Sequence, residues 1–369
     1  MVKPVPKVKS TIANGPIDDS LEDPYVDEQL QAEERVLDQL RENKFSCSDL
    51  NDLQVRIGLT PSHPMLESSY FIETEQASNF YNVVYDNILA RKSGLYCMGE
   101  FRVGKTKAIS NAIHRLEVDM PWAAVFLHSA KRVTHQTKKA FCLDLIRSFS
   151  CFFTNRQNPE RLLTRYLMAQ AIKAGSKTCV LFIDEAQMLT VLQLRYLLEI
   201  WNELRLEGFL LVTVLVGQKG LDSLKQLTDE EDHGAVIARF FVNAMHIGGL
   251  HSLTQLRIYL EAFDSKLIYP PNSDWSFSRF FCNVAYSSGW RLSSEADVFW
   301  ESLVLFSRPS KRALQVSGFR LAFLNDAIHG FFLDSMKNDK RQFKGTKKIW
   351  TDAISGAATS DLLIGDGNA

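Results

Sequence analysis

The sequence lacks an apolar run long enough to cross a bilayer, because its longest, near Phe209 to Val216, is far shorter than the ~20 residues of a spanning helix. It also opens with MVKPVPKVKS, which has no apolar centre of the kind found in a signal peptide. The six cysteines include no C-x-x-C pair, which favours reduced structural thiols over a zinc site. We therefore expect a soluble, cytoplasmic protein that makes no contact with a membrane.

Charge of one sign is not in excess either. Lysine and arginine number 42 against 43 aspartates and glutamates, so the formal net charge is −1. This balance excludes a uniformly basic nucleic-acid binder but leaves a local basic patch open. With 369 residues, 46% hydrophobic and 23% charged, the chain is long enough for two or three globular domains with a large core.

Composition divides the chain into four regions. Residues 1–45 include Asp18 to Glu34, with eight acidic residues and no basic one, so we expect an acidic, disordered tail. This tail is either a solubilising arm or a docking segment for a partner. Residues 251–336 carry only helical patterns and predict a small all-helical lid domain. Residues 337–369 predict a basic and then flexible C-terminal tail, because six basic residues precede a stretch of Gly, Ala and Ser.

The fourth region, residues 46–250, alternates strand-like runs with helical stripes. The runs are continuously apolar, which is typical of parallel strands that are covered on both faces. We therefore predict an α/β fold, a parallel P-loop sheet with flanking helices. The expected strands are Leu95–Met98, Trp122–His128, Cys179–Asp184, Leu210–Gly217 and Ala244–Ile247.

One motif in this region points to a nucleotide. GEFRVGKT, Gly99 to Thr106, matches the phosphate-binding loop G-x-x-x-x-G-K-[ST] in full and lies between a strand and a helical stripe. In such a loop, backbone N–H groups and the start of the helix surround phosphate oxygens. Lys105 is expected to reach the β- and γ-phosphates and Thr106 to hold Mg²⁺. The predicted nucleotide-binding residues are Gly99, Glu100, Phe101, Arg102, Val103, Gly104, Lys105, Thr106 and Lys107.

A second motif supplies acidic groups. CVLFIDEAQ, Cys179 to Gln187, is a buried strand that delivers Asp184 and Glu185 at its carboxyl end, where open α/β sheets bind ligands. Asp184 is expected to hold the Mg²⁺ and Glu185 to orient and deprotonate the attacking water. The two motifs together predict ATP and Mg²⁺ as cofactors and ATP hydrolysis as the reaction.

Three further residues complete the predicted ATPase site. Gln218 follows the strand Leu210–Gly217 and would reach the γ-phosphate if that strand lies between those carrying the loop and Asp184. In this order it is similar to the sensor of an AAA+ ATPase. Arg239 precedes the last strand, where AAA+ proteins place a finger for the nucleotide of the neighbouring subunit; the alternative is a surface salt bridge. Arg312 in RPSKRALQ is loosely similar to a second sensor, with Lys311 as a competitor, because the usual leading glycine is missing.

Over about residues 60 to 330 the chain resembles the AAA+ ATPases of the TniB and TnsC type, and more distantly MuB. The resemblance is carried by GEFRVGKT, VLFIDEAQML, VLVGQKGL and ARF in that order. It implies an ATP-dependent regulator of cut-and-paste transposition that assembles on double-stranded DNA as a ring or filament. It also implies two protein partners, a target-selection protein of the TniQ/TnsD type and a transposase.

A basic segment is the candidate DNA surface. HSAKRVTHQTKKAF, His128 to Phe141, contains basic and hydroxyl groups and no acid, which suits phosphate contacts without base reading. The predicted DNA-binding residues are Lys131, Arg132, Thr134, His135 and Lys138. The alternative is a solvated helix start, because charge runs are usually solvated faces.

Two other functions share these motifs. An initiator-type AAA+ ATPase, such as a helicase loader or an origin binder, would normally add a DNA-reading module such as a helix-turn-helix. A nucleotide-gated interaction switch would bind ATP with little turnover, and Glu185 argues against it. The sequence leaves open the targeting partner, the number of subunits and the rate of hydrolysis.

Overall fold

The computed structural model describes residues 49–133, 136–154, 157–231 and 233–357. The chain divides into two units between Val55 and Arg56, and the second contains the sheet and the candidate site. The acidic tail expected for residues 1–45, and the predicted DNA contacts Thr134 and His135, lie outside the described residues.

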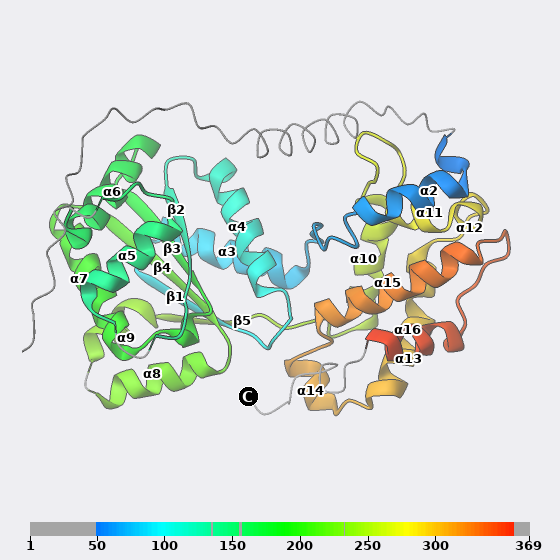
Figure 1. The fold of residues 1–369 in the computed structure, drawn as a ribbon. Coiled ribbons are helices and arrows are strands. Elements are labelled where there is room, and N and C mark those ends of the chain that lie inside the picture. The colour runs from blue at the N-terminus through cyan, green and yellow to red at the C-terminus, as the bar shows by residue number, and fades with distance from the viewer. Residues whose placement is uncertain (1–48, 134–135, 155–156, 232, 358–369) are drawn as a thin grey trace, which may run out of the picture. The chain divides into compact units, whose positions relative to one another are not determined.

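A five-stranded parallel sheet forms the centre of the α/β region (Figure 1). The strand order is β2-β3-β4-β1-β5, with all four neighbouring pairs parallel. Each apolar run singled out in the sequence forms one of these strands, so the predicted parallel P-loop sheet is confirmed. The strands are β1 (Gly94–Met98), β2 (Ala124–Ser129), β3 (Thr178–Asp184), β4 (Leu210–Gly217) and β5 (Asn243–His246).

Helices cover both faces of the sheet, as the interior strand β3 shows. All seven of its residues are buried, and its apolar residues alternate between two cores. Val180 and Phe182 pack with α3 and α4 on one face, whereas Leu181 and Ile183 pack with α5 to α9 on the other. The helices are α3 (Glu75–Leu89), α4 (Lys105–Asp119), α5 (Lys138–Ser148), α6 (Pro159–Ala174), α7 (Val191–Leu206), α8 (Gly220–Glu230) and α9 (Gly234–Phe240).

Helices predominate after β5. The expected helices over 254–268, 295–306 and 320–337 are present as α10, α13 and α15. Residues 56–70 of the predicted α/β region pack here rather than on the sheet: Arg56 Nη1 donates to Phe280 O at 2.7 Å. The bounds are α2 (Leu53–Leu59), α10 (Leu253–Ser265), α11 (Phe277–Phe281), α12 (Asn283–Ser287), α13 (Ala296–Ser307), α14 (Lys311–Val316), α15 (Leu321–Lys337) and α16 (Lys347–Ala357).

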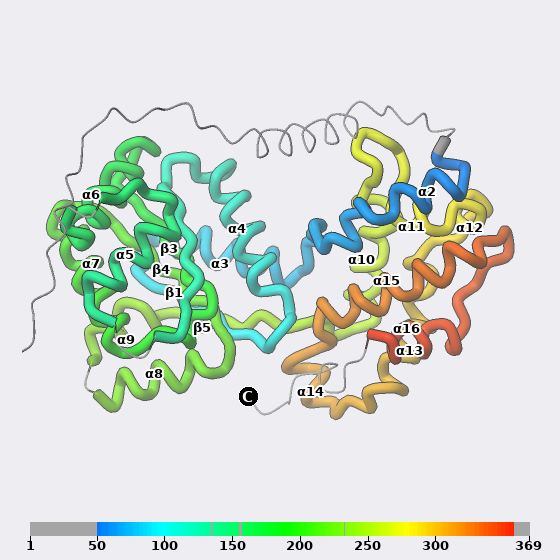
Figure 2. Tube along the Cα trace, viewed as in Figure 1, coloured from blue at the N-terminus to red at the C-terminus, as the bar shows by residue number. Residues whose placement is uncertain are grey.

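The structure differs from the sequence interpretation near the C-terminus, where a flexible tail was expected from residue 337. Helix α16 instead packs against α13 and α15 (Figure 2). Trp350 is fully buried and stacks between Phe299 and Phe331, with both ring centroids 4.0 Å away. An aromatic sandwich of this kind buries a large apolar area, so residues 347–357 belong to the helical region.

Two further sequence expectations concern single features. Within the described part of the chain, no helix combines the length and hydrophobicity needed to span a bilayer. The five cysteines in this part are all unpaired, and Cys97 and Cys179 are buried within strands as expected.

Candidate nucleotide site

The phosphate loop connects the end of β1 to the start of α4, and its two glycines meet different demands. Gly104 has φ of 96°, a left-handed conformation that other residues adopt only at a cost. A Cβ on Gly99 would lie 2.5 Å from the carbonyl oxygen of Ile247, so only glycine fits there. The loop is therefore built as the motif predicts, with the N-terminus of α4 facing its concave side.

Lys105 is the first residue of α4 and is only 5% exposed. Its Nζ donates to the backbone oxygens of Gly99, at 3.1 Å, and Glu100, at 2.8 Å. Burial lowers the pKa of this amine, while the nearby carboxylates of Glu185 and Asp184 act to raise it. The loop thus holds a cation whose hydrogen-bond partners are two neutral carbonyl groups.

Thr106 and Asp184 lie together although 78 residues separate them. Thr106 Oγ1 donates to Asp184 Oδ2 at 2.7 Å, and Asp184 is buried at the carboxyl end of β3. A hydroxyl and a carboxylate are the hard oxygen ligands that Mg²⁺ takes from a protein beside nucleotide phosphates. These two residues therefore fit the metal that the motifs imply.

Glu185 is the residue after Asp184 and has φ of 52°, a left-handed conformation that is uncommon for residues other than glycine. The strand order meets the condition set for Gln218, because β4 lies between β3 and β1. Gln218 Nε2 donates to Glu185 Oε2 at 3.2 Å. The predicted sensor and the predicted base are thus in direct contact. Gln187, which the sequence interpretation did not single out, donates to the same oxygen at 2.5 Å.

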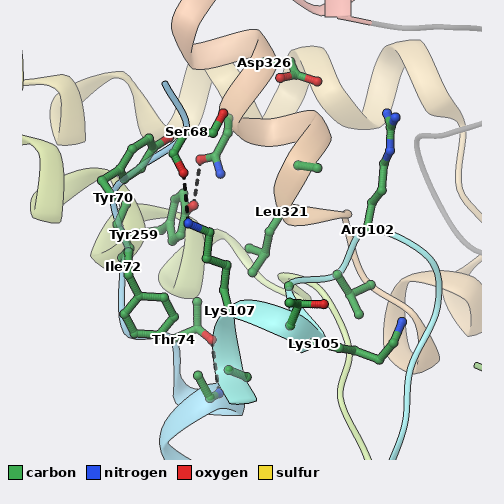
Figure 3. A pocket seen from close by; sticks show the side chains of 18 of the residues that line it. Ser68, Tyr70, Ile72, Thr74, Arg102, Lys105, Lys107, Tyr259, Leu321 and Asp326 are labelled. Atoms are coloured by element: carbon green, nitrogen blue, oxygen red, sulfur yellow. Dashed lines mark hydrogen bonds between the residues drawn. The ribbon is translucent and has the colours of Figure 1, made fainter. Parts of the chain in front are cut away.

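A cavity of about 490 Å³ adjoins the loop, and Glu185 contributes to its wall. Segments from three places line it: residues 65–77, the loop with the start of α4, and the first half of α15 (Figure 3). Lys105 and Lys107 leave α4 on different sides, and Lys107 Nζ donates to Ser68 O at 2.9 Å. Tyr259 also lines the cavity, and its Oη donates to Asn325 Oδ1 at 2.7 Å. The volume suits a small-molecule ligand the size of a nucleotide.

The arginine beside the loop is Arg320, which the sequence interpretation did not single out. Arg312 and its competitor Lys311 are exposed on α14. Arg320 caps α15 and is 7% exposed, and its Nη2 lies 3.8 Å from Glu100 Oε2. Its Nε has no hydrogen-bond partner in the described structure. The leading glycine that is usual before a second sensor, and that Arg312 lacks, is present before Arg320, because Gly318 precedes it by two positions.

Arg239 lies at the end of α9, directly before β5. Its guanidinium lies over the indole of Trp201, 4.8 Å from the ring centroid, and its backbone oxygen accepts from Ser93 Oγ at 3.0 Å. The side chain is partly exposed. The guanidinium is therefore held by an aromatic ring within its own chain, and among the described residues no carboxylate forms an ion pair with it.

The basic segment after β2 divides into two parts. Lys131 and Arg132 are exposed. Lys138 is instead enclosed by Glu160, Glu199 and Glu203, at 3.3, 2.8 and 3.6 Å. Burial acts to lower the pKa of Lys138, but the bonds and charges of Glu199 and Glu160 outweigh it and raise that pKa. Lys138 thus joins α5 to α6 and α7, which counts against its predicted contact with DNA.

Comparison with known proteins gives a match to one family model and a partial likeness to several solved structures. No curated protein matches the sequence. Among solved structures, ORC2 of Aeropyrum pernix, in ADPNP-ADP complexes, has a TM-score of 0.49 and 12% identity, over 78% of this chain and 68% of that one. Cdc6p of Pyrobaculum aerophilum has a TM-score of 0.47 and 14% identity, over 72% and 62%. Domain III of the replication initiation protein DnaA of Thermotoga maritima has a TM-score of 0.39 and 12% identity, over 77% and 93%. Residues 89–224, which contain the phosphate loop and the Asp184–Glu185 pair, match the family model described as AAA domain.

Proposed function

We propose that the chain binds ATP with Mg²⁺ at the phosphate loop and hydrolyses it. The observation that carries this proposal is the contact of Thr106 with Asp184 at 2.7 Å, beside buried Lys105 and the carboxylate of Glu185. These groups are a phosphate counter-charge, a metal-ligand pair and a proton acceptor, which is the set that phosphoryl transfer to water needs.

Each residue has a distinct part in this proposal. Lys105 binds the β- and γ-phosphates, and Thr106 and Asp184 hold the metal, which when bound neutralises charge on the phosphate oxygens. Glu185 takes a proton from the attacking water at a carboxylate oxygen. Gln218, which is hydrogen-bonded to Glu185, senses the γ-phosphate. Arg320 supplies a positive charge from the helical side of the cavity, the part first given to Arg312.

The test is ATP binding and turnover by the wild-type chain and by Lys105→Ala, with Lys92→Ala as the control. We expect Lys105→Ala to lose nucleotide binding, because the loop loses its buried cation. Lys92 is exposed and lies outside the cavity, so Lys92→Ala should keep nucleotide binding within a few-fold. Wild-type ATP affinity in Lys105→Ala would contradict the assigned site.

We further propose that Arg239 completes the site of a neighbouring copy of the chain. Its partly exposed position before β5 and its support by Trp201 suit an arginine presented from a rigid base. Arg239→Ala should bind nucleotide normally as a single subunit but hydrolyse it slowly. Mixing it with Lys105→Ala, which retains Arg239, should restore part of the turnover; a lack of recovery at every ratio would contradict the proposal.

The finer proposal is that the chain is an ATP-dependent regulator that assembles on double-stranded DNA. It rests on the exposed pair Lys131 and Arg132 and on the resemblance to TniB and TnsC, which adds a target-selection protein and a transposase as partners. In the variant that carries both Lys131→Ala and Arg132→Ala, the affinity for duplex DNA should fall. Its affinity should also depend less steeply on salt concentration, because fewer counterions are released on binding. Arg161 and Arg165, also exposed, provide the matched control pair.

Four observations test this proposal against its rivals. An unchanged salt slope in the Lys131 and Arg132 variant would leave the exposed basic residues near Lys344 as the next candidates for DNA contacts. Sequence-selective binding would favour an initiator-type ATPase, and ATP binding without turnover a nucleotide-gated switch. A transposase gene beside this one would favour the transposition regulator.

A further inference from the structure

Gln187 lies on a short 3-10 turn, Ala186–Met188, directly after the proposed catalytic pair. Its side chain makes two hydrogen bonds to groups on different strands. Nε2 donates to Glu185 Oε2 at 2.5 Å, and Oε1 accepts from the backbone N–H of Gln218 at 3.0 Å. The amide therefore bridges the residue after β3 and the residue after β4.

The orientation of this amide is fixed by its partners. An ionised carboxylate accepts hydrogen bonds and a backbone N–H only donates them. Turning the amide over would place oxygen against oxygen at Glu185 and N–H against N–H at Gln218. The amide can therefore bridge the two groups in one orientation only. An amide suits this position because it carries both a donor for Glu185 and an acceptor for the Gln218 N–H.

Two glycines make room for this side chain. A Cβ on Gly217 would collide with Gln187 Oε1, and a Cβ on Gly220 would lie 3.2 Å from Gln187 Cβ. Neither glycine has a positive φ, so space rather than backbone conformation accounts for both. The end of β4 is therefore shaped around Gln187.

We propose that Gln187 is a positioning residue that holds the Glu185 carboxylate in place and couples it to the end of β4. This inference rests on the proposed ATPase function. Gln187 and Gln218 both donate to Oε2, so Oε1 is the oxygen left to accept a proton from water. A change at the γ-phosphate that moves Gln218 shifts both of its bonds, one directly to Glu185 and one through Gln187.

The experiment measures ATP affinity, kcat and the melting temperature for Gln187→Ala and Gln187→Glu. We expect kcat to fall at least tenfold in Gln187→Ala, with ATP affinity within about twofold, because the change removes one of two bonds that orient the base. Gln187→Glu preserves the size of the side chain, and its carboxylate can still accept from the backbone N–H of Gln218. The same carboxylate repels that of Glu185, so we expect a still lower kcat. This second variant keeps the test valid if the alanine variant folds poorly.

A double variant separates positioning from a structural role. In a Glu185→Gln background, Gln187→Ala should cause little further loss of kcat, because the residue that it positions is already disabled. Gln193→Ala is the matched control. Gln193 belongs to the capping box of α7, so its loss should lower the melting temperature but not kcat.

The outcomes distinguish this inference from the function on which it rests. If the kcat of both Gln187 variants stayed within twofold of the wild-type value, the positioning role alone would be overturned. Equal loss of affinity and kcat, or full additivity with Glu185→Gln, would also overturn it. A wild-type chain that binds ATP through Lys105 but never hydrolyses it would overturn the proposed ATPase and the inference together.

Discussion

The two walls of the nucleotide cavity are prepared in different ways. On the sheet side, the polar groups are already bonded to one another: Thr106 to Asp184, and Gln218 to Glu185. On the helical side, Arg320 Nε and His329 Nε2 have no hydrogen-bond partner in the described structure. Buried polar atoms without partners are costly, so the polar groups on the helical side are less well satisfied than those on the sheet side. Substitutions on each side test whether this difference matters for binding and turnover.

The largest expected effect is on the sheet side. Glu185→Gln should lower kcat by about 100-fold or more while ATP affinity stays within a few-fold, because the neutral amide cannot accept a proton. Single-turnover hydrolysis and equilibrium nucleotide binding measure the two quantities separately. Turnover near the wild-type rate would mean that another residue is the base.

Arg320→Ala probes the helical wall, and Arg312→Ala is its matched control. Losing a buried cation that faces the loop should weaken ATP binding or turnover by about 10- to 100-fold, as expected for a charged hydrogen bond. Arg312 is exposed, so Arg312→Ala should weaken ATP binding or turnover by less than about twofold. The reverse order of effects would restore the sequence-based choice of Arg312.

His63 lies behind the helical wall, enclosed by four aromatic rings that include Tyr269 and Phe277 at centroid distances of 4.6 and 4.3 Å. Burial, with the charge of His329, lowers its pKa from 6.5 to about 3. Its unfolded form takes up a proton near pH 6.5 and its folded form does not, so stability should fall as pH drops from 6.5 towards 3. The loss should be about 1.4 kcal/mol per pH unit, a tenfold change in the folding equilibrium.

Denaturant unfolding at pH 7, 6 and 5 measures this slope. The slope should become shallower in His63→Phe, whereas His114→Gln, at an exposed histidine, should leave it unchanged. Identical slopes for wild type and His63→Phe would mean that other groups control acid unfolding.

The smallest expected effect joins the two walls. Glu100 Oε2 lies 3.8 Å from Arg320 Nη2, so its carboxylate competes with phosphate for the same guanidinium. Glu100→Gln should therefore raise ATP affinity by about two- to fivefold, the range of a partly exposed ion pair. Glu117→Gln, far more exposed on α4, is the control. Lower affinity in Glu100→Gln would show that the pair supports the loop.

The sequence was informative where a local pattern determines the structure. The phosphate loop, Asp184, Glu185 and Gln218 each follow a continuous apolar strand, so the strand alone places them at the carboxyl edge of the sheet. The predicted strands differ from the observed ones by at most two residues at either end.

The sequence was less informative where the contacts of a residue come from distant parts of the chain. Lys138 was assigned to the DNA surface, but Glu160, Glu199 and Glu203, on two later helices, surround it. Arg320 was not singled out, although Gly318 supplies the leading glycine that Arg312 lacks. Helix α16 was obscured by lysines, yet Trp350 and Ile354, four residues apart, mark its buried face.

Helix α15 begins on the phosphate loop itself, because the backbone N–H of Ala322 donates to Arg102 O at 3.3 Å. Its 17 residues extend roughly 25 Å from that contact, at about 1.5 Å per residue. If α15 moved as a rigid body about this contact, a tilt of about 5° would displace its far end by about 2 Å. Trp350 stacks on Phe331, in the second half of α15, so the buried aromatic sandwich would move with it. Through this contact, a change in the shape of the loop would reach the packing of α16, which is remote from the loop.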